Sequence, residues 1–157
     1  MSRLTGVLVF AALAAVALPA PASAQSSVEV GTLSCRLAPS VGLLVGSRQR
    51  MSCVFTLANT NRKETYSGAI TRLGLDVGIT AGGRLVWAVR SKTNLPIGKR
   101  TLAGTYVGAS GEIALGLGVG ANALVGGTNR TIALQPLSVE GSVGVSLAVG
   151  VAGLRLQ

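Results

Sequence analysis

The feature that most constrains the fold of this chain is the run Ile113–Gly120, which is I-A-L-G-L-G-V-G. Its odd-numbered positions hold large apolar residues, and its even-numbered positions hold only Ala or Gly. Because successive side chains of a strand point to opposite faces, this run predicts a strand with one apolar face and one almost bare face. Glycine within a strand often marks a close approach of another backbone or a ligand. The same alternation returns at Val143–Val151, so the chain is predicted to be built from β-strands.

The N-terminal segment Met1–Ala24 has the parts of a secretory signal peptide. Arg3 precedes an apolar core at Leu4–Leu18, and Ala22–Ala24 forms an A-x-A cleavage pattern. The alternative is an uncleaved anchor, but the apolar core is too short for a stable transmembrane helix. Cleavage after this pattern leaves residues 25–157 as a single β domain. We therefore expect an exported, periplasmic protein with no transmembrane span.

The remaining chain alternates in short runs that are separated by turns rich in Gly, Pro and Asn, and no long segment shows a capped helical period. Ala81–Gly83 predicts a hairpin and Pro136 predicts a strand break. The pattern is typical of an all-β, mostly antiparallel domain of about eight to ten strands, either a β-sandwich or a small closed β-barrel. The other predicted strands are Val28–Cys35, Gln49–Leu57, Glu64–Leu73, Gly74–Thr80, Arg84–Arg90, Thr101–Gly108, Thr131–Leu134 and Val143–Leu156.

The two cysteines, Cys35 and Cys53, both lie in predicted strands of the exported part. An even number of cysteines in an oxidising compartment favours a disulfide. A metal site would need more ligands than two Cys in a chain without His, and a redox-active pair would more naturally be C-x-x-C. We predict a structural disulfide between neighbouring strands, which closes a loop of about 17 residues and stabilises the fold by about 3 kcal/mol.

Positive charge is concentrated in the first half of the exported chain. Residues 25–100 hold eleven Lys or Arg and three acidic residues, whereas Arg130 and Arg155 are balanced by Glu112 and Glu140. Such a basic half attracts anionic lipid head groups, phosphorylated glycans or acidic polymers, and the alternative is that these charges are only solvated loop and edge residues. Nucleic acid is disfavoured as a partner, because aromatic residues make up only 3% of the chain and leave few stacking platforms. The candidate anionic-ligand contacts are Arg48, Arg50, Arg84, Arg90, Lys92, Lys99 and Arg100.

The residues of common catalytic sites are missing or scattered. The chain has no His, its cysteines are predicted to be paired, and its five acidic residues stand singly. We therefore expect no enzymatic activity, no cofactor and no metal. Asp76 is predicted to form a structural ion pair with a neighbouring Arg, either Arg72 or Arg84. Trp87 lies in a strand that is apolar on both faces and is predicted to pack in the core.

Six sequence blocks of the exported chain form one pattern. They are V-G-x-L-x-C at Val30–Cys35, R-M-S-C-V-F around Cys53, the stretch from Tyr66 to Gly78, Leu85–Val89, Leu102–Gly108 and Gly116–Gly141. Together these blocks resemble the exported alphaproteobacterial proteins of unknown function that are grouped as domain of unknown function 992. The resemblance extends over essentially the whole exported chain and implies a cell-envelope location and a single domain. It assigns no catalytic residue.

Two functions are compatible with these features. The first is a non-enzymatic envelope protein that binds an anionic amphiphile or glycolipid, with the basic half at the head group and an acyl chain between glycine-rich strands. It predicts an internal cavity lined by Leu and Val with Arg at its mouth. The second is a structural or interaction protein of the envelope. That function needs an envelope protein partner and an exposed apolar patch or a free strand edge.

Overall fold

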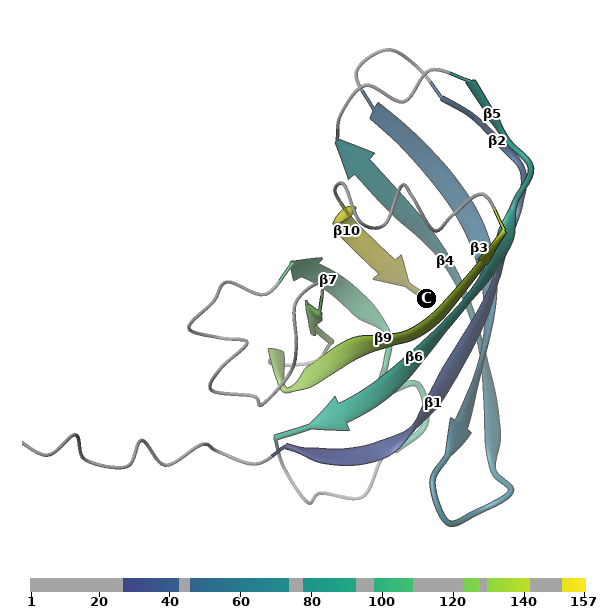
Figure 1. Ribbon diagram of the computed structural model, residues 1–157. Helices are drawn as coiled ribbons and strands as arrows, with labels where there is room; N and C mark the ends of the chain where they lie inside the picture. The colour runs from purple at the N-terminus through teal and green to yellow at the C-terminus, as the bar shows by residue number, and fades with distance from the viewer. Residues whose placement is uncertain are drawn as a thin grey trace, which may run out of the picture.

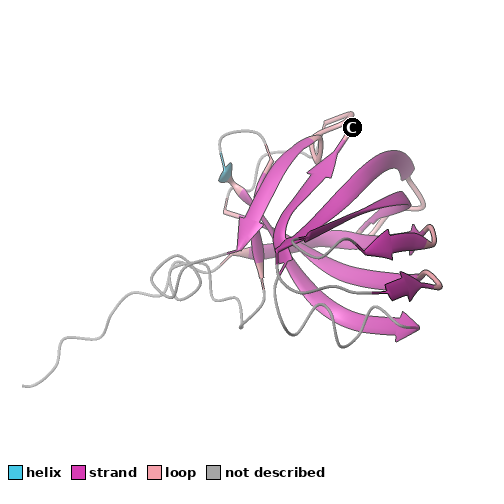
Figure 2. Ribbon diagram, turned by 90° about the horizontal axis from the view of Figure 1, so that it is seen from above, coloured by secondary structure: helices cyan, strands magenta, loops and turns pink. Residues whose placement is uncertain are grey.

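The fold was analysed in a computed structural model of the chain, which describes residues 27–42, 46–73, 78–92, 98–108, 123–127, 130–141 and 151–157. These residues are almost entirely β-strand (Figures 1 and 2). The strands are β1 (Val28–Leu37), β2 (Ser40–Gly42), β3 (Gly46–Leu57), β4 (Lys63–Leu73), β5 (Gly78–Thr80), β6 (Gly83–Ser91), β7 (Gly104–Gly108), β8 (Leu124–Gly126), β9 (Ile132–Gly141) and β10 (Val151–Leu156).

Eight of these strands form a closed antiparallel barrel. Their order around the barrel is β1-β3-β4-β10-β7-β8-β9-β6, and β6 pairs again with β1. Each of the eight strands therefore has two hydrogen-bonded neighbours, and closure leaves none of them as an edge strand. The all-β prediction is confirmed, and the barrel is the correct one of the two predicted architectures. The short strands β2 and β5 form a separate two-stranded sheet at one end of the barrel (Figure 1).

The barrel interior is filled by apolar side chains from alternate strand positions. On β3, Met51, Cys53 and Phe55 point inward, as their spacing predicts, and each is at most 5% exposed. Trp87 on β6 is completely buried, which confirms its predicted place in the core. Tyr66 of β4 and the fully buried Tyr106 of β7 belong to the same cluster. In the described residues the inside of the wall is thus a continuous packed core.

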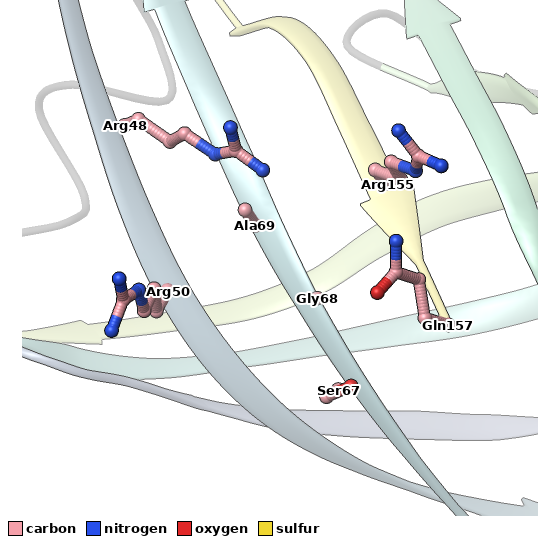
Figure 3. Close-up of a pocket in the computed structure, with 7 residues that line it drawn as sticks. All are labelled: Arg48, Arg50, Ser67, Gly68, Ala69, Arg155 and Gln157. Atoms are coloured by element: carbon pink, nitrogen blue, oxygen red, sulfur yellow. The ribbon is translucent and has the colours of Figure 1, made fainter.

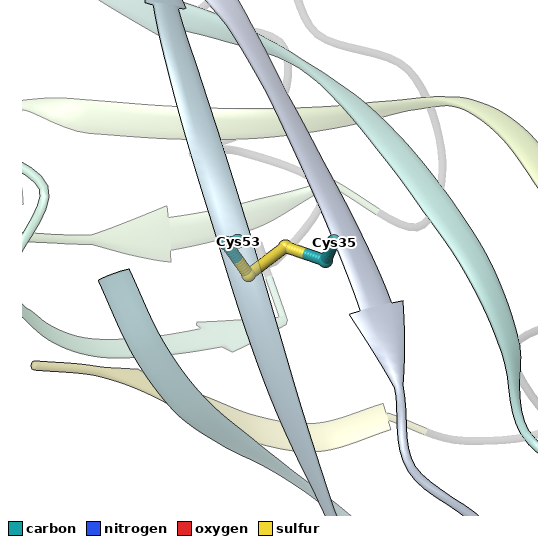
Figure 4. The surroundings of a disulfide bond; sticks show 2 residues. All are labelled: Cys35 and Cys53. Atoms are coloured by element: carbon teal, nitrogen blue, oxygen red, sulfur yellow. A yellow bond between two sulfur atoms is a disulfide. The ribbon is translucent and has the colours of Figure 1, made fainter. Parts of the chain in front are cut away.

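The predicted disulfide joins Cys35 of β1 to Cys53 of β3 (Figure 4). The two residues are direct register partners in the antiparallel ladder, and their Cα atoms are 4.0 Å apart. Both side chains point into the barrel and are almost completely buried. The disulfide therefore links two adjacent strands of the barrel on its inner face, and the predicted link between neighbouring strands is confirmed.

The hairpin predicted at Ala81–Gly83 is wrong, because this segment bends a strand instead of reversing it. β5 pairs with β2, and β6 pairs with β1, so the two pairs form one ladder that bends between them. Gly82 lies at the bend with φ +92°, and a Cβ at this position would lie 2.7 Å from the Leu37 carbonyl oxygen. Glycine is suited to such a bend as well as to a hairpin, because it has no steric penalty at positive φ. The Gln49 side chain donates a 2.6 Å hydrogen bond to the Ala38 carbonyl oxygen on the opposite side of the bend.

Pro136 does not end its strand, contrary to the sequence prediction. β9 continues from Ile132 to Gly141, and the register with β6 shifts between Val86 and Trp87, which pairs with Pro136. A proline lacks an amide hydrogen and is tolerated in a sheet at an edge or a bulge. The described pairing of β9 with β8 ends at Leu134, so Pro136 lies beyond that ladder as well as at a bulge.

Two strand glycines show the close backbone approach that the glycine-rich pattern predicts, although at other positions. A Cβ on Gly68 of β4 would lie 2.5 Å from the Arg155 carbonyl oxygen of β10. A Cβ on Gly126 of β8 would lie even closer to the Thr105 carbonyl oxygen of β7. Any larger residue would force these strand pairs apart. The strand predicted at Ile113–Gly120, most of Val143–Val151 and the signal peptide Met1–Ala24 lie outside the described residues.

Candidate functional site

The outer wall of the barrel has a row of small residues between two strands that bear arginines. On β4, Ser67, Ala69 and Thr71 alternate with the inward-facing residues and therefore point outward. Ala69 is the register partner of Arg50 on β3 and also of Arg155 on β10. The small side chains of β4 thus form a floor, and long cationic side chains rise from the strands on both sides.

This arrangement creates a hollow of about 460 Å³ that is open to solvent (Figure 3). In Figure 3, Arg48 extends from β3 across β4 toward Ala69, while Arg155 and Gln157 lie on the β10 side. Ala69 points outward but is only 8% exposed, because the long neighbouring side chains cover it. The lining residues, which we call the arginine trough, are Arg48, Arg50, Ser67, Gly68, Ala69, Arg155 and Gln157.

The trough continues along the barrel wall toward β7. A second hollow of about 280 Å³ shares Arg48, Ala69 and Arg155 with the trough and adds Thr71 of β4 and Thr105 of β7. Thr105 is the register partner of Arg155 on the side away from β4. The arginines are therefore surrounded by hydroxyl groups, which can donate hydrogen bonds to an anionic ligand.

The charge of the trough is uncompensated within the part of the chain that the structure describes. Arg48, Arg50 and Arg155 are all exposed, and none of the trough residues is acidic. The described residues contain one salt bridge, between Arg62 and Glu64, and it lies outside the trough. Three arginines that border a small-residue floor form a suitable site for a phosphate or a carboxylate, because each guanidinium can donate paired hydrogen bonds to such a group. In Figure 3 the Arg48 guanidinium extends over β4, and the Arg50 guanidinium lies on the side of β3 away from β4.

The predicted anionic-ligand contacts are only partly brought together. Arg48 and Arg50 lie in the trough, and Arg84 lies two strands from β3, on β6. The Arg90 guanidinium instead holds the start of β1, because it donates hydrogen bonds of 2.9 Å and 2.8 Å to the Ser27 hydroxyl and carbonyl oxygens. Neither of the two hollows described above is lined by Arg84, Arg90, Lys92, Lys99 or Arg100.

The trough also contains one arginine that sequence reasoning missed. Arg155 follows a part of the chain in which basic and acidic residues are balanced, so nothing in the local sequence distinguishes it. β10 lies next to β4 only because the barrel closes, and this pairing places Arg155 opposite Ala69. The only sequence feature that could have indicated a role for Arg155 in the site was its outward-facing position in the last predicted strand.

The ion pair predicted for Asp76 stays a prediction. Asp76 lies outside the described residues, and the structure describes only the backbone pairing of Arg72, which is with Ser47 and Val151.

A second polar cluster lies at the end of the barrel where the 98–103 segment crosses. The Tyr66 hydroxyl donates a 2.7 Å hydrogen bond to Glu64, and the Arg100 amide donates a 3.1 Å hydrogen bond to the same carboxylate oxygen. The Leu102 amide donates to the Tyr66 hydroxyl, and the Tyr106 hydroxyl donates to the Leu102 carbonyl oxygen. These bonds attach the segment across the barrel end, with Leu102 completely buried.

The pKa values of this cluster follow from burial and hydrogen bonding. Desolvation raises the pKa of Glu64, but the hydrogen bonds from Tyr66, Arg62 and Arg100 together outweigh it and hold that pKa below its ordinary value of 4.5. Burial, followed by the hydrogen bond to Glu64, raises the pKa of Tyr66 to about 12. Burial also raises the pKa of Tyr106. The tyrosines therefore stay neutral at physiological pH and act as hydrogen-bond donors.

The lowered pKa of Glu64 predicts an acid-sensitive contribution to stability. Because the folded state binds the Glu64 proton more weakly than the unfolded state, this contribution is present above pH 4.5 and is lost as the pH falls through the folded pKa. Urea unfolding at several pH values should show that Glu64→Gln lowers stability by about 1–3 kcal/mol at pH 7 and has a smaller effect below pH 4. An equal loss at both pH values would contradict the assigned role of the carboxylate.

Two further features bear on the chemistry that the described residues can perform. No three His, Cys, Asp or Glu side chains among them are grouped closely enough to hold a metal ion. None of their helical segments is long and apolar enough to cross a membrane.

Comparison with known proteins gives a family but no further relative. The model of the family described as protein of unknown function (DUF992) matches residues 13–157. No curated protein and no solved structure matches the chain. The match extends over nearly the whole chain, including the β1 and β3 strands with their disulfide and the strands of the trough. On this evidence, the chain belongs to the DUF992 family.

Proposed function

We propose that this protein is a non-enzymatic, exported protein of the cell envelope that binds an anionic amphiphile or glycolipid through the arginine trough. The observation that supports this proposal is the grouping of Arg48, Arg50 and Arg155 around a floor of small residues, without an acidic residue in the lining. Exposed arginines without acidic partners repel one another, and an anionic ligand relieves this repulsion. The buried disulfide favours an oxidising compartment such as the periplasm.

The proposed ligand lies on the outer wall of the barrel, whereas the sequence predicted a ligand in an internal cavity. The sequence suggested an acyl chain inside the barrel, whereas the inward-facing side chains of the described strands are packed together as a buried cluster. The trough lies on the outer wall and has hydroxyl, amide and guanidinium groups. We therefore assign the contact to the anionic head group.

The alternative function as an interaction protein of the envelope receives less support. The exposed large apolar residues of the described chain are Val28, Val54, Val107 and Leu137. No two of them are register partners, so the pairing does not gather them into a patch. Each of the eight barrel strands has a hydrogen-bonded neighbour on both sides, although the described pairing of β9 with β8 ends at Leu134.

Binding to lipid vesicles tests the proposal. The purified protein is expected to sediment with vesicles containing phosphatidylglycerol and to stay in solution with vesicles of phosphatidylcholine alone. The variant R48Q/R50Q/R155Q is expected to bind the anionic vesicles about 100-fold more weakly, because each basic residue near an anionic surface contributes about 1 kcal/mol.

A matched variant separates the trough from the overall charge. K63Q/K92Q/K99Q removes three positive charges from exposed positions outside the trough and is expected to change binding by only a few-fold. An equal loss of binding in both triple variants would show that only net charge matters and would overturn the proposal.

A further inference from the structure

A second pair of arginines lies in its own hollow on the same outer wall. Arg36 of β1 and Arg84 of β6 are direct register partners, and both are exposed. They line a hollow of about 330 Å³ together with the hydroxyl residues Ser34, Ser52 and Thr65. Like charges directly opposite each other destabilise a sheet, so this pair lowers stability unless an anion lies between the two groups.

The two arginine sites are neighbours on the barrel wall. Arg36 pairs with Ser52 of β3, which is two residues from Arg50 on the same face. This makes Arg36 and Arg50 diagonal neighbours with Cα atoms about 7–8 Å apart. In the view of Figure 3, the Arg50 guanidinium lies on the side of β3 away from β4, which is the side where β1 pairs. Arg50 is therefore placed between the trough and the second site.

The row of arginine positions ends at β9, and serine hydroxyl groups lie between the two sites. On the far side, the next register partner of Arg84 is Glu140 of β9, so the run of basic positions ends there. Between the two sites, Ser52 and Ser67 are register partners on neighbouring strands, and both are exposed. Arg36 is separated from Ala69, the floor of the trough, by two strand spacings across the sheet and two residues along the strands, so the two sites lie about 12 Å apart.

We infer that the ligand of this wall has two anionic groups about 12 Å apart, one bound by the arginine trough and the other by Arg36 and Arg84. This inference rests on the proposed function and specifies its ligand class, namely a head group with two phosphate esters or comparable anions joined by a spacer about the size of one sugar. Ser52 and Ser67 are placed to donate hydrogen bonds to the spacer. A ligand with one anionic group would occupy only one of the two sites.

A comparison of a sugar bisphosphate with a sugar monophosphate tests this inference. By isothermal titration calorimetry, the protein is expected to bind glucose 1,6-bisphosphate at least about 10-fold more tightly than glucose 6-phosphate, because the second group binds at a high effective concentration. R36Q/R84Q is expected to remove this advantage and to leave binding of the monophosphate in the arginine trough unchanged. R50Q/R155Q is expected to weaken binding of both sugars. K92Q/K99Q removes the same number of charges outside both sites and should change neither affinity.

The outcomes distinguish the inference from the proposed function. Equal binding of the two sugars, or a bisphosphate affinity that R36Q/R84Q does not change, would overturn the two-anion ligand. A third probe is dextran sulfate, a linear polyanion. If dextran sulfate binds while both sugars fail to bind and fail to displace it, the ligand is a polymer and the inference is again wrong. If neither sugar binds but phosphatidylglycerol vesicles do, only the two-anion inference fails. If the vesicles also fail to bind, the proposed function itself is overturned.

Discussion

Trp87→Ala is expected to lower the free energy of unfolding by about 3–5 kcal/mol. Trp87 is fully buried and lies on β6 in the centre of the barrel interior, where its register partner on β1 is Leu33. Truncation removes the largest side chain of the core and leaves a cavity that the closed wall cannot fill by collapse. Guanidinium unfolding followed by far-UV circular dichroism measures the change, since Trp87 is the only tryptophan available for fluorescence.

The conservative variant Trp87→Phe separates packing from hydrogen bonding. The indole Nε1 atom is buried and has no hydrogen-bond partner among the described residues. Removing an unsatisfied buried N–H recovers about 1–3 kcal/mol, which offsets much of the lost volume. We expect Trp87→Phe to stay within about 1.5 kcal/mol of the natural protein. A loss as large as that of Trp87→Ala would show that the indole N–H has a partner, such as a buried water molecule.

Removal of the disulfide is expected to destabilise the barrel by about 3 kcal/mol. Cys35 and Cys53 are separated by 18 positions in the sequence, and the bond restricts the unfolded chain between them. Guanidinium unfolding of C35A/C53A, compared with the natural protein in the presence and absence of a reductant, measures the change. The reductant should lower the stability of the natural protein and leave the double variant unaffected. A change below about 1 kcal/mol would show that the barrel stabilises this strand pair without the bond.

The outer wall shows how a stable core permits an unfavourable surface. Arg36 and Arg84 place like charges opposite each other on neighbouring strands, and Arg50 and Arg155 lie on the two strands that flank β4. Such an arrangement costs stability in the absence of a ligand. Local features that oppose stability are common at binding sites, where the ligand provides the missing interaction. This is the physical reason for assigning function to the wall instead of the packed interior.

Much of the local structure followed from the sequence. The two-residue period of β1, β3 and β4 predicted these strands, and it also identified the inward face that contains Met51, Cys53 and Phe55. The short apolar run of β6 between two arginines predicted that strand. The disulfide and the burial of Trp87 were also predicted. These features depend on residues within one strand or on the chemistry of a single residue type, and both are visible in a short stretch of sequence.

The sequence predictions that were wrong concern residue types that occur in more than one kind of local backbone structure. Gly82 suits a bend as well as a hairpin, and Pro136 suits a bulge as well as a chain break. Which use applies depends on whether a neighbouring strand continues past the residue, and the sequence of one segment does not contain this information.

By itself, the sequence determined β1, β3, β4 and β6, the inward face of β3, the disulfide and the excess of positive charge. Only the tertiary structure decided that the sheet closes into a barrel and that the charge gathers on one wall. The reason is that β10 pairs with β4 more than 80 residues earlier in the chain. Such distant pairing depends on how all the strands share one core, and it brings Arg155 to the arginines of β3, although nothing near Arg155 in the sequence distinguishes it from a solvated charge.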